Sequence, residues 1–276
     1  MNEARLSGSV IDCATAASLM APLTDLVIRA GAAILAVDRL AMKVEGKTDG
    51  SPVTQADLAA DHIIAEGLAH LIPEIPAISE ERAHLAKSPY HGSFFLIDPL
   101  DGTKEYVAGR NEFTVNLALV SDGTPLLGII GVPALGLIWR GLVGQGAQRL
   151  TTGSTAAAAE PIQTRRMPPH GSPWIAAVSR SHGDARTEAF IERRPGATRL
   201  ELGSAVKFGR IAEGAADIYP RLAPTCEWDV AAGHAIVTAA GGKVTDMEGA
   251  ALRFGTGAKD FIVPGFIAWG DPAATR

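Results

Sequence analysis

The stretch SFFLIDPLDGTKEY, residues 93–106, brings two carboxylates to the end of an apolar run. The apolar residues predict a buried strand that ends at Asp98, and the Pro-Leu pair after it predicts a sharp bend that closes at Asp101. Like charges this close repel each other unless a dication lies between them. Carboxylates, together with the backbone carbonyl of Leu100, form the oxygen-only ligand set that Mg²⁺ prefers. We therefore expect this bend to form one side of a magnesium site.

Three further acids lie at the ends of predicted elements, where side chains from separate segments can converge. Glu80 follows the predicted strand IPAIS, residues 75–79, and Asp57 lies in the first turn of a helix that Thr54 caps in a T-x-x-D box. Asp229 lies at the start of another predicted helix. Each acid also has a purely structural explanation, because acids are common in turns and in first helical turns. Their joint occurrence favours one shared site.

The composition limits the classes of function. The chain has 276 residues, of which 47% are hydrophobic, and a formal net charge of −5, which argues against nucleic acid as a partner. Two distant cysteines form no disulfide framework, and the seven histidines lack zinc-ligand spacing. The N-terminal residues contain no signal-peptide pattern, and glycine and proline break the longest uncharged run, 123–139, into two predicted strands. These features predict a cytoplasmic protein without a membrane span, and peripheral association with the inner membrane stays open.

The order of the segments predicts two domains. Residues 1–155 are expected to form an α+β domain with an antiparallel meander and most of the metal ligands. Its predicted helices and strands are residues 19–42, 57–71, 75–79, 93–98, 112–120, 125–133 and 135–143. The boundary is placed in the small, polar and proline-rich residues 151–173. Strands and helices alternate over residues 156–276, which predicts an α/β domain that supplies Asp229 and the residues that recognise substrate.

Two boxes resemble the signature of the inositol monophosphatase superfamily. They are DPLDGT, residues 98–103, and WDVAA, residues 228–232, and the pair Glu80-Glu81 precedes the first box. The resemblance extends from about residue 20 to FIVPGFIA, residues 261–268. It implies an α/β fold, a layered αβαβα sandwich, and a magnesium-dependent, lithium-sensitive phosphatase.

Within the superfamily the chain is most similar to bacterial 3′(2′),5′-bisphosphate nucleotidases of the CysQ type. The stretches SPVTQAD (51–57), IPAISEE (75–81), DPLDGTKEY (98–106) and GSAVKF (203–208) carry this resemblance. Inositol monophosphatases usually read D-G-T-T-N-F in the first box, and they place a glutamate where this chain has Leu222. The difference favours an anionic substrate over a polyol.

The resemblance implies a role for each matched position. Five groups would hold two or three Mg²⁺ ions: Glu80, Asp98, the carbonyl of Leu100, Asp101 and Asp229. Asp57 and Thr103, with Glu80 nearby, would position and activate the attacking water, and Gly102 and Thr103 would contact the scissile phosphate. His182, Ser204, Lys207 and Arg221 would contact the nucleotide. From the residues alone, Lys207 could equally be a surface cation and His182 an ordinary loop histidine.

The predicted reaction is hydrolysis of the 3′-phosphate of adenosine 3′,5′-bisphosphate to AMP and phosphate. The resemblance adds 3′-phosphoadenylyl sulfate as a second substrate, and a link to sulfate assimilation. Two alternative activities stay open, inositol monophosphatase and fructose-1,6-bisphosphatase. An alternative of another class is a binding partner of the RNA machinery with a dispensable phosphatase activity. The oligomeric state, monomer or dimer, is also open.

Overall fold

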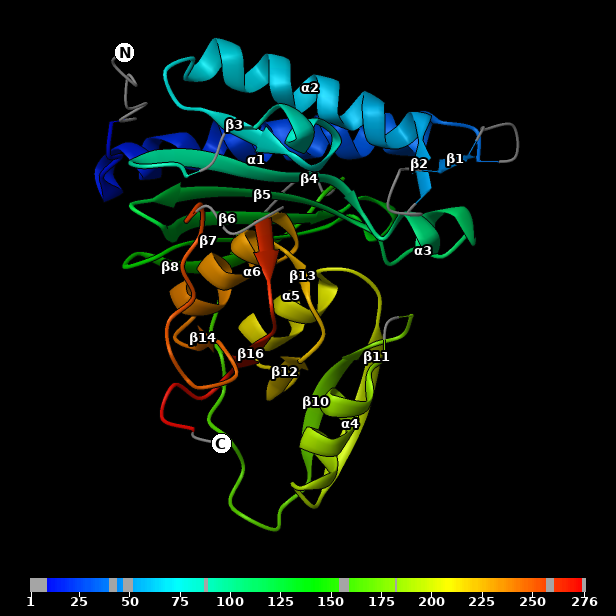
Figure 1. Cartoon of the computed structure of the whole chain (residues 1–276), viewed down its shortest axis with the longest axis vertical. Coiled ribbons are helices and arrows are strands. Elements are labelled where there is room, and N and C mark those ends of the chain that lie inside the picture. The colour runs from blue at the N-terminus through cyan, green and yellow to red at the C-terminus, as the bar shows by residue number, and fades with distance from the viewer. Residues whose placement is uncertain are drawn as a thin grey trace.

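The chain folds into five stacked layers in the order helix, sheet, helix, sheet, helix (Figure 1). The computed structural model describes residues 9–39, 44–46, 52–86, 89–153, 159–181, 183–256 and 261–274. The helices are α1 (Cys13–Ala36), α2 (Gln55–Leu71), α3 (Thr103–Val107), α4 (Ala185–Glu192), α5 (Val206–Ala212) and α6 (Glu227–Ala239). Helices α1 and α2 form the first layer, α5 and α6 the middle layer, and α4 lies outside the second sheet. The predicted αβαβα sandwich is confirmed.

The first sheet has seven strands in the order β3-β4-β5-β6-β7-β8-β9. Strand β3 pairs parallel with β4, and every later pair is antiparallel. The bounds are β3 (Ala77–Ser79), β4 (Ser93–Asp101), β5 (Thr114–Ser121), β6 (Thr124–Val132), β7 (Leu137–Leu142), β8 (Gly146–Thr151) and β9 (Glu160–Ile162). The predicted meander is confirmed, and the uncharged run 123–139 forms β6 and β7 as expected.

The second sheet is mixed, with the order β11-β10-β12-β16-β14. Strands β10, β11 and β12 are parallel, and β16 runs antiparallel to β12 and β14. The bounds are β10 (Trp174–Ser179), β11 (Ala197–Leu202), β12 (Ile218–Arg221), β14 (Lys243–Thr245) and β16 (Phe266–Trp269). The remaining strands form two small antiparallel sheets. In one, β1 (Val44–Gly46) pairs with β2 (Pro52–Thr54), and in the other, β13 (Thr225–Cys226) pairs with β15 (Ile262–Val263). The alternation of strands and helices along residues 156–276 predicted an α/β arrangement of this kind.

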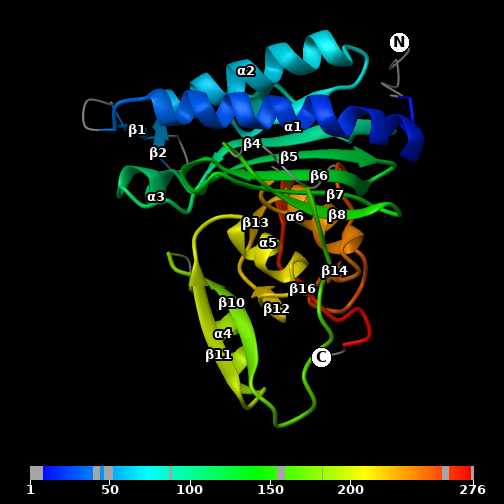
Figure 2. The same ribbon diagram turned by 180° about the vertical axis from the view of Figure 1, so that it is seen from behind.

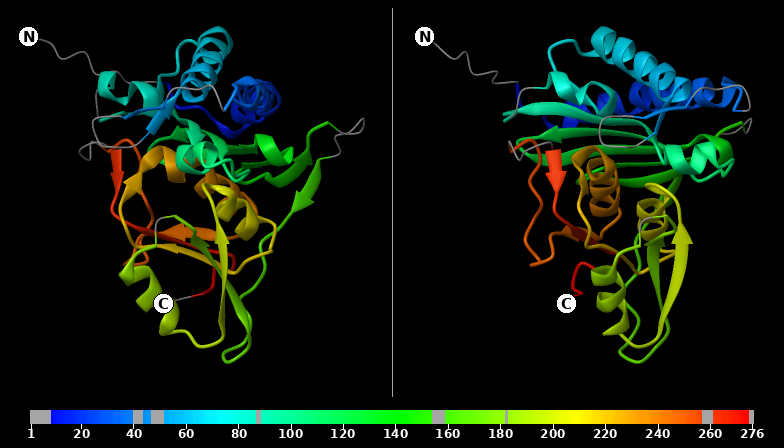
Figure 3. Two further views of the ribbon diagram at one scale, coloured as in Figure 1. Left: turned by 90° about the vertical axis from the view of Figure 1, so that its right-hand side faces the viewer. Right: turned by 45° about the vertical axis from the view of Figure 1, so that its right-hand side comes forward.

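Helix α1 starts earlier and ends earlier than its apolar period predicts. Asp12 caps it by accepting a hydrogen bond from the backbone N–H of Thr15, at 2.8 Å, and the helix ends at Ala36. By length and composition α1 could cross a bilayer. In this fold α1 lies beside α2 on one face of the first sheet (Figures 2 and 3). Leu23, Val27 and the other residues of its apolar stripe are buried in the core that these elements share. The core therefore accounts for part of the hydropathy of α1, while Ile28 and Leu35 of the same helix stay exposed.

Helix α6 lies between the two sheets and carries Asp229 in its first turn. Its packing depends on Gly128 of β6, because a Cβ atom at this position would overlap the carbonyl oxygen of Ala232. Gly233 makes the same allowance for the ring of Phe208 on α5. Close packing at these two glycines sets how near α6 lies to the first sheet.

The proposed division into residues 1–155 and 156–276 stays a prediction. Strand β9 adds to the first sheet beyond residue 155, and α6 packs against the strands β4 to β7. The two parts are therefore joined by a large shared core in addition to the connecting chain.

Candidate active site

The two aspartates of the first box lie in a bulge of β4. Asp98 pairs with Asn116 and Asp101 pairs with Thr114, so three steps along β4 match two steps along β5. The expectation that the strand ends at Asp98 was wrong, because β4 continues to Asp101 through the extra residue. Pro99 is tolerated there because β3 pairs only with residues 95–97 and needs no N–H from Pro99.

Three carboxylates from separate elements meet beside this bulge. Ligand oxygens of Glu80, Asp98 and Asp229 all lie within 4.8 Å of one another. Glu80 begins the 3₁₀ turn after β3, Asp98 is on β4, and Asp229 is in the first turn of α6. Asp101 lines the same cavity, which has a volume of about 200 Å³, and so does Leu100. The predicted metal ligands therefore converge, although their spacing in the sequence spans 150 residues.

The electrostatics of this cluster suit a bound cation. Burial, and then the charges of Glu80, Asp101 and Asp229, raise the pKa of Asp98 well above its usual value. Burial and the neighbouring Asp229 raise the pKa of Asp101 to about 6. Burial and mutual repulsion thus disfavour the charged form of these carboxylates in the absence of a cation. A site that offers only oxygen donors is the ligand set that a hard divalent cation takes.

Asp57 reaches the cavity through Thr103. The Thr103 hydroxyl donates a hydrogen bond to Oδ1 of Asp57 at 3.1 Å, with the Leu100 carbonyl oxygen as a second acceptor at 3.2 Å. Oδ2 of Asp57 accepts from the Thr54 backbone N–H at 2.7 Å, so the predicted capping box of α2 is present. The structural and the functional explanations of Asp57 thus both apply, because the capping bond aims Oδ1 at Thr103.

Asp229 combines the same two roles. Its Oδ2 accepts from the Cys226 backbone N–H at 3.2 Å, as in a capping box, and from the Thr225 hydroxyl. Lys207 and Arg221 line the same cavity, and their positive charges act on Asp101. Nζ of Lys207 donates to the Ser204 carbonyl at 2.5 Å, and burial lowers the pKa of Lys207 to about 8. Nε of Arg221 is buried and has no hydrogen-bond partner among the described residues.

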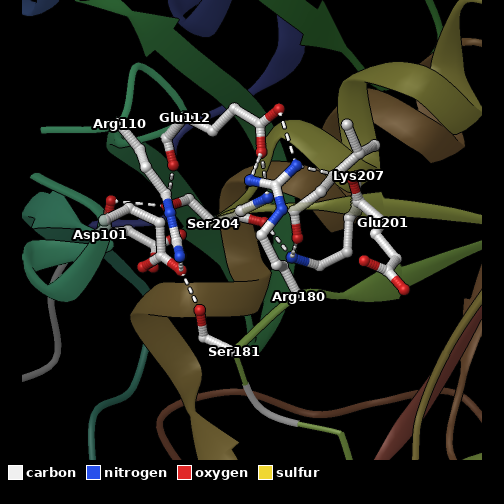
Figure 4. Close-up of polar contacts among 11 residues, drawn as sticks. Asp101, Arg110, Glu112, Arg180, Ser181, Glu201, Ser204 and Lys207 are labelled. Atoms are coloured by element: carbon white, nitrogen blue, oxygen red, sulfur yellow. Dashed lines mark hydrogen bonds and ion pairs between the residues drawn. The ribbon is translucent and has the colours of Figure 1, made fainter. Parts of the chain in front are cut away.

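A set of polar contacts, here called the clasp, joins the first sheet to the second beside the cavity (Figure 4). Glu112 accepts two hydrogen bonds from the Arg180 guanidinium, at 2.5 and 3.2 Å, and one from the Gly203 backbone N–H at 2.7 Å. The Ser204 hydroxyl lies 2.8 Å from the Asp101 carbonyl oxygen and 2.9 Å from that of Glu112. These bonds hold Ser204 in a left-handed conformation, with φ of 49°, against the backbone of Asp101.

The structure brings together all of the predicted site residues that it describes. Every predicted residue except Asp57 and His182 lines the cavity, and Asp57 contacts it through Thr103. His182 lies outside the described residues. Sequence reasoning missed Glu105 and Thr225, which line the same cavity. Thr225 lies four residues before Asp229, just ahead of the helix that carries Asp229, and Glu105 was visible as part of the GTKEY variant of the first box.

Comparisons with known proteins agree with this geometry. The model of the inositol monophosphatase family matches residues 16–272. The 3′(2′),5′-bisphosphate nucleotidase CysQ of Escherichia coli K12 is 38% identical over 226 residues, 82% of this chain and 88% of that protein. The CysQ nucleotidase of Salmonella typhimurium LT2 is 38% identical over 251 residues, 90% of this chain and 98% of that protein. The crystal structure of CysQ from Bacteroides thetaiotaomicron matches with a TM-score of 0.76 and 32% identity, covering 93% and 98% of the two chains. The chain belongs to the inositol monophosphatase family of phosphatases.

Proposed function

We propose that this protein is a Mg²⁺-dependent phosphomonoesterase that converts adenosine 3′,5′-bisphosphate to AMP and phosphate. One observation carries the proposal: a single cavity is lined both by the clustered carboxylates and by two cations, Lys207 and Arg221. A metal-held phosphate fits the carboxylates, and a second anionic group fits Lys207 and Arg221. Relatives 38% identical to this chain carry the name 3′(2′),5′-bisphosphate nucleotidase. The sulfate-bearing analogue, 3′-phosphoadenylyl sulfate, has the same pattern of charges and is a second substrate.

The metal would be held by Glu80, Asp98, the Leu100 carbonyl, Asp101 and Asp229, with two or three ions in all. The donor set fits, because ligand oxygens of three of these carboxylates, Glu80, Asp98 and Asp229, already lie within 4.8 Å of one another. When bound, Mg²⁺ neutralises phosphate oxygens and lowers the pKa of a coordinated water.

The remaining chemistry belongs to side chains and backbone of this chain. Oδ1 of Asp57 accepts a hydrogen bond from the Thr103 hydroxyl, so the Thr103 oxygen can in turn accept a hydrogen bond from the attacking water. Gly102 has φ of 90° and directs the chain into α3, where its N–H and the Thr103 hydroxyl face the scissile phosphate. Ser204 holds the Asp101 carbonyl in place and so fixes the direction of the Asp101 side chain.

The second phosphate is the feature that separates the substrate classes. Arg221 is half-buried, its Nε has no hydrogen-bond partner among the described residues, and a guanidinium can bind two phosphate oxygens at once. Leu222, at the position where inositol monophosphatases carry a glutamate, is buried in an apolar cluster with Phe190 and Ile267. The chain therefore offers cations for a phosphate and no carboxylate at that position for an inositol hydroxyl.

Substitution of Arg221 tests this assignment. Arg221→Gln removes a charge-assisted contact worth about 1.5–3 kcal/mol, so kcat/KM for adenosine 3′,5′-bisphosphate should fall about 10- to 150-fold. Adenosine 3′-monophosphate has no second phosphate, so its hydrolysis should change far less. Lys207→Ala should show the same substrate dependence. Arg199→Gln, a surface arginine paired with Glu188, is the control and should leave both rates unchanged. Equal losses on the two substrates would assign Arg221 to the fold instead.

A further inference from the structure

The cavity contains one acid more than the metals need. Among the described residues, five carboxylate side chains line it: Glu80, Asp98, Asp101, Glu105 and Asp229. Four of them are assigned above to the metal ions. Glu105 lies on α3, two residues after Thr103, and is only 3% exposed. A buried carboxylate beside a phosphate site opposes anion binding, so its presence needs a separate explanation.

The known contacts of Glu105 all use one of its two oxygens. The Ser181 hydroxyl donates to Oε1, and the guanidinium of Arg110 lies 3.7 Å from the same atom (Figure 4). The side chain also packs against Gly203, where a Cβ atom would lie 3.1 Å from Cγ of Glu105. Within the part of the chain that the structure describes, no donor forms a hydrogen bond to Oε2. The carboxylate is thus fixed in place with one oxygen available.

The surroundings of Glu105 restrict what that oxygen can accept. An anionic group would be repelled, whereas an uncharged hydroxyl or amine would form a charge-assisted hydrogen bond. Thr103, which lies two residues before Glu105 on α3, is assigned above to the scissile phosphate. In a nucleoside 3′,5′-bisphosphate, the ribose 2′-hydroxyl is the uncharged donor on the carbon next to the reacting 3′-oxygen.

We infer that Glu105 is a specificity-determining residue whose Oε2 accepts a hydrogen bond from the ribose 2′-hydroxyl of the substrate. This inference rests on the proposed function and adds to it that the enzyme distinguishes ribonucleotides from deoxyribonucleotides. Ser181 and Arg110 hold Oε1 and so fix the Glu105 carboxylate in the wall of the cavity.

The experiment compares two substrates, adenosine 3′,5′-bisphosphate and 2′-deoxyadenosine 3′,5′-bisphosphate, in the presence of Mg²⁺. The native protein should prefer the ribonucleotide in kcat/KM by about 10- to 100-fold, the size of one hydrogen bond to a charged group. Glu105→Ala should lower this ratio to near the intrinsic difference between the two sugars. Glu105→Gln, which keeps the shape and loses the charge, should give an intermediate ratio.

Glu112→Gln is the matched control, because Glu112 belongs to the clasp and does not line the cavity. This variant should lower both rates by one factor and keep the native ratio. The inference is overturned if the native protein treats the two substrates alike, or if Glu105→Ala lowers both rates equally. Failure to hydrolyse either substrate would overturn the proposed function itself, and this outcome is distinct from equal hydrolysis of both.

Discussion

Asp101 illustrates how one residue can serve function at the expense of stability. Its carboxylate accepts weak hydrogen bonds from Thr114, at 3.3 Å, and Asn116, at 3.4 Å, and it lies near the charge of Asp229. Repulsion between two carboxylates amounts to about 4 kcal/mol at 4 Å and an effective dielectric constant near 20. Removing the negative charge of Asp101 should therefore lower activity without lowering the stability of the metal-free protein.

Asp101→Asn should abolish turnover and leave the metal-free protein at least as stable as the native one. The amide keeps the size of the side chain and removes one negative charge from the cluster. Urea unfolding in the presence of a chelator measures the free energy of unfolding of both proteins, and phosphate release with Mg²⁺ measures turnover. A variant that is active, or clearly less stable without metal, would show that Asp101 does not serve as a metal ligand.

The raised pKa of Asp101 predicts a pH dependence for the metal-free protein. Its pKa in the folded protein, about 6, lies above the ordinary value of 3.8, so folding favours the protonated form. The contribution of this group to stability is therefore fully present below about pH 4 and is lost as the pH rises through 6. Melting temperatures measured with a chelator across this window should fall with pH in the native protein, and should fall less in Asp101→Asn. Parallel profiles would contradict the prediction.

At the scale of elements, the sequence predicted those helices and strands that depend on interactions between residues close together in the chain. The Thr54 cap and the meander of β4 to β7 were predictable because capping and alternation act within a few residues. The start of α1 was missed, because its first turns consist of small residues without an apolar period, and the cap at Asp12 was not used. The extension of β4 to Asp101 was missed because the bulge forms only against β5, which lies elsewhere in the sequence.

The contact between α6 and β6 gives an element-scale prediction. Gly128→Ala should destabilise the protein by about 1–3 kcal/mol, because the new methyl group overlaps the Ala232 carbonyl and displaces α6. Since α6 carries Asp229, the remaining folded protein should also need more Mg²⁺ for half-maximal activity. Gly183→Ala is the control, because nothing lies within 4 Å of a Cβ atom there. An unchanged Mg²⁺ requirement in Gly128→Ala would show that α6 does not set the position of Asp229.

At the scale of the molecule, the site exists only where the layers meet. The 3₁₀ turn after β3, the bulge of β4 and the first turn of α6 each supply acids, and the end of β12 supplies Arg221. Sequence spacing identified these residues as candidates, but their distances depend on how the sheets pack through α6. The clasp residues Glu112 and Arg180 could not be recognised in advance, because each is an ordinary surface charge until the two sheets come together.

Phosphate release from a panel of substrates tests the central claim most directly. The panel consists of adenosine 3′,5′-bisphosphate, adenosine 3′-monophosphate, inositol 1-phosphate and fructose 1,6-bisphosphate, each with Mg²⁺. The cations Lys207 and Arg221 in the cavity predict that kcat/KM is highest for adenosine 3′,5′-bisphosphate, by at least about 10-fold, the effect of one charge-assisted contact. A chelator should abolish the activity. Equal or faster hydrolysis of inositol 1-phosphate, or release that persists without divalent metal, would contradict the account.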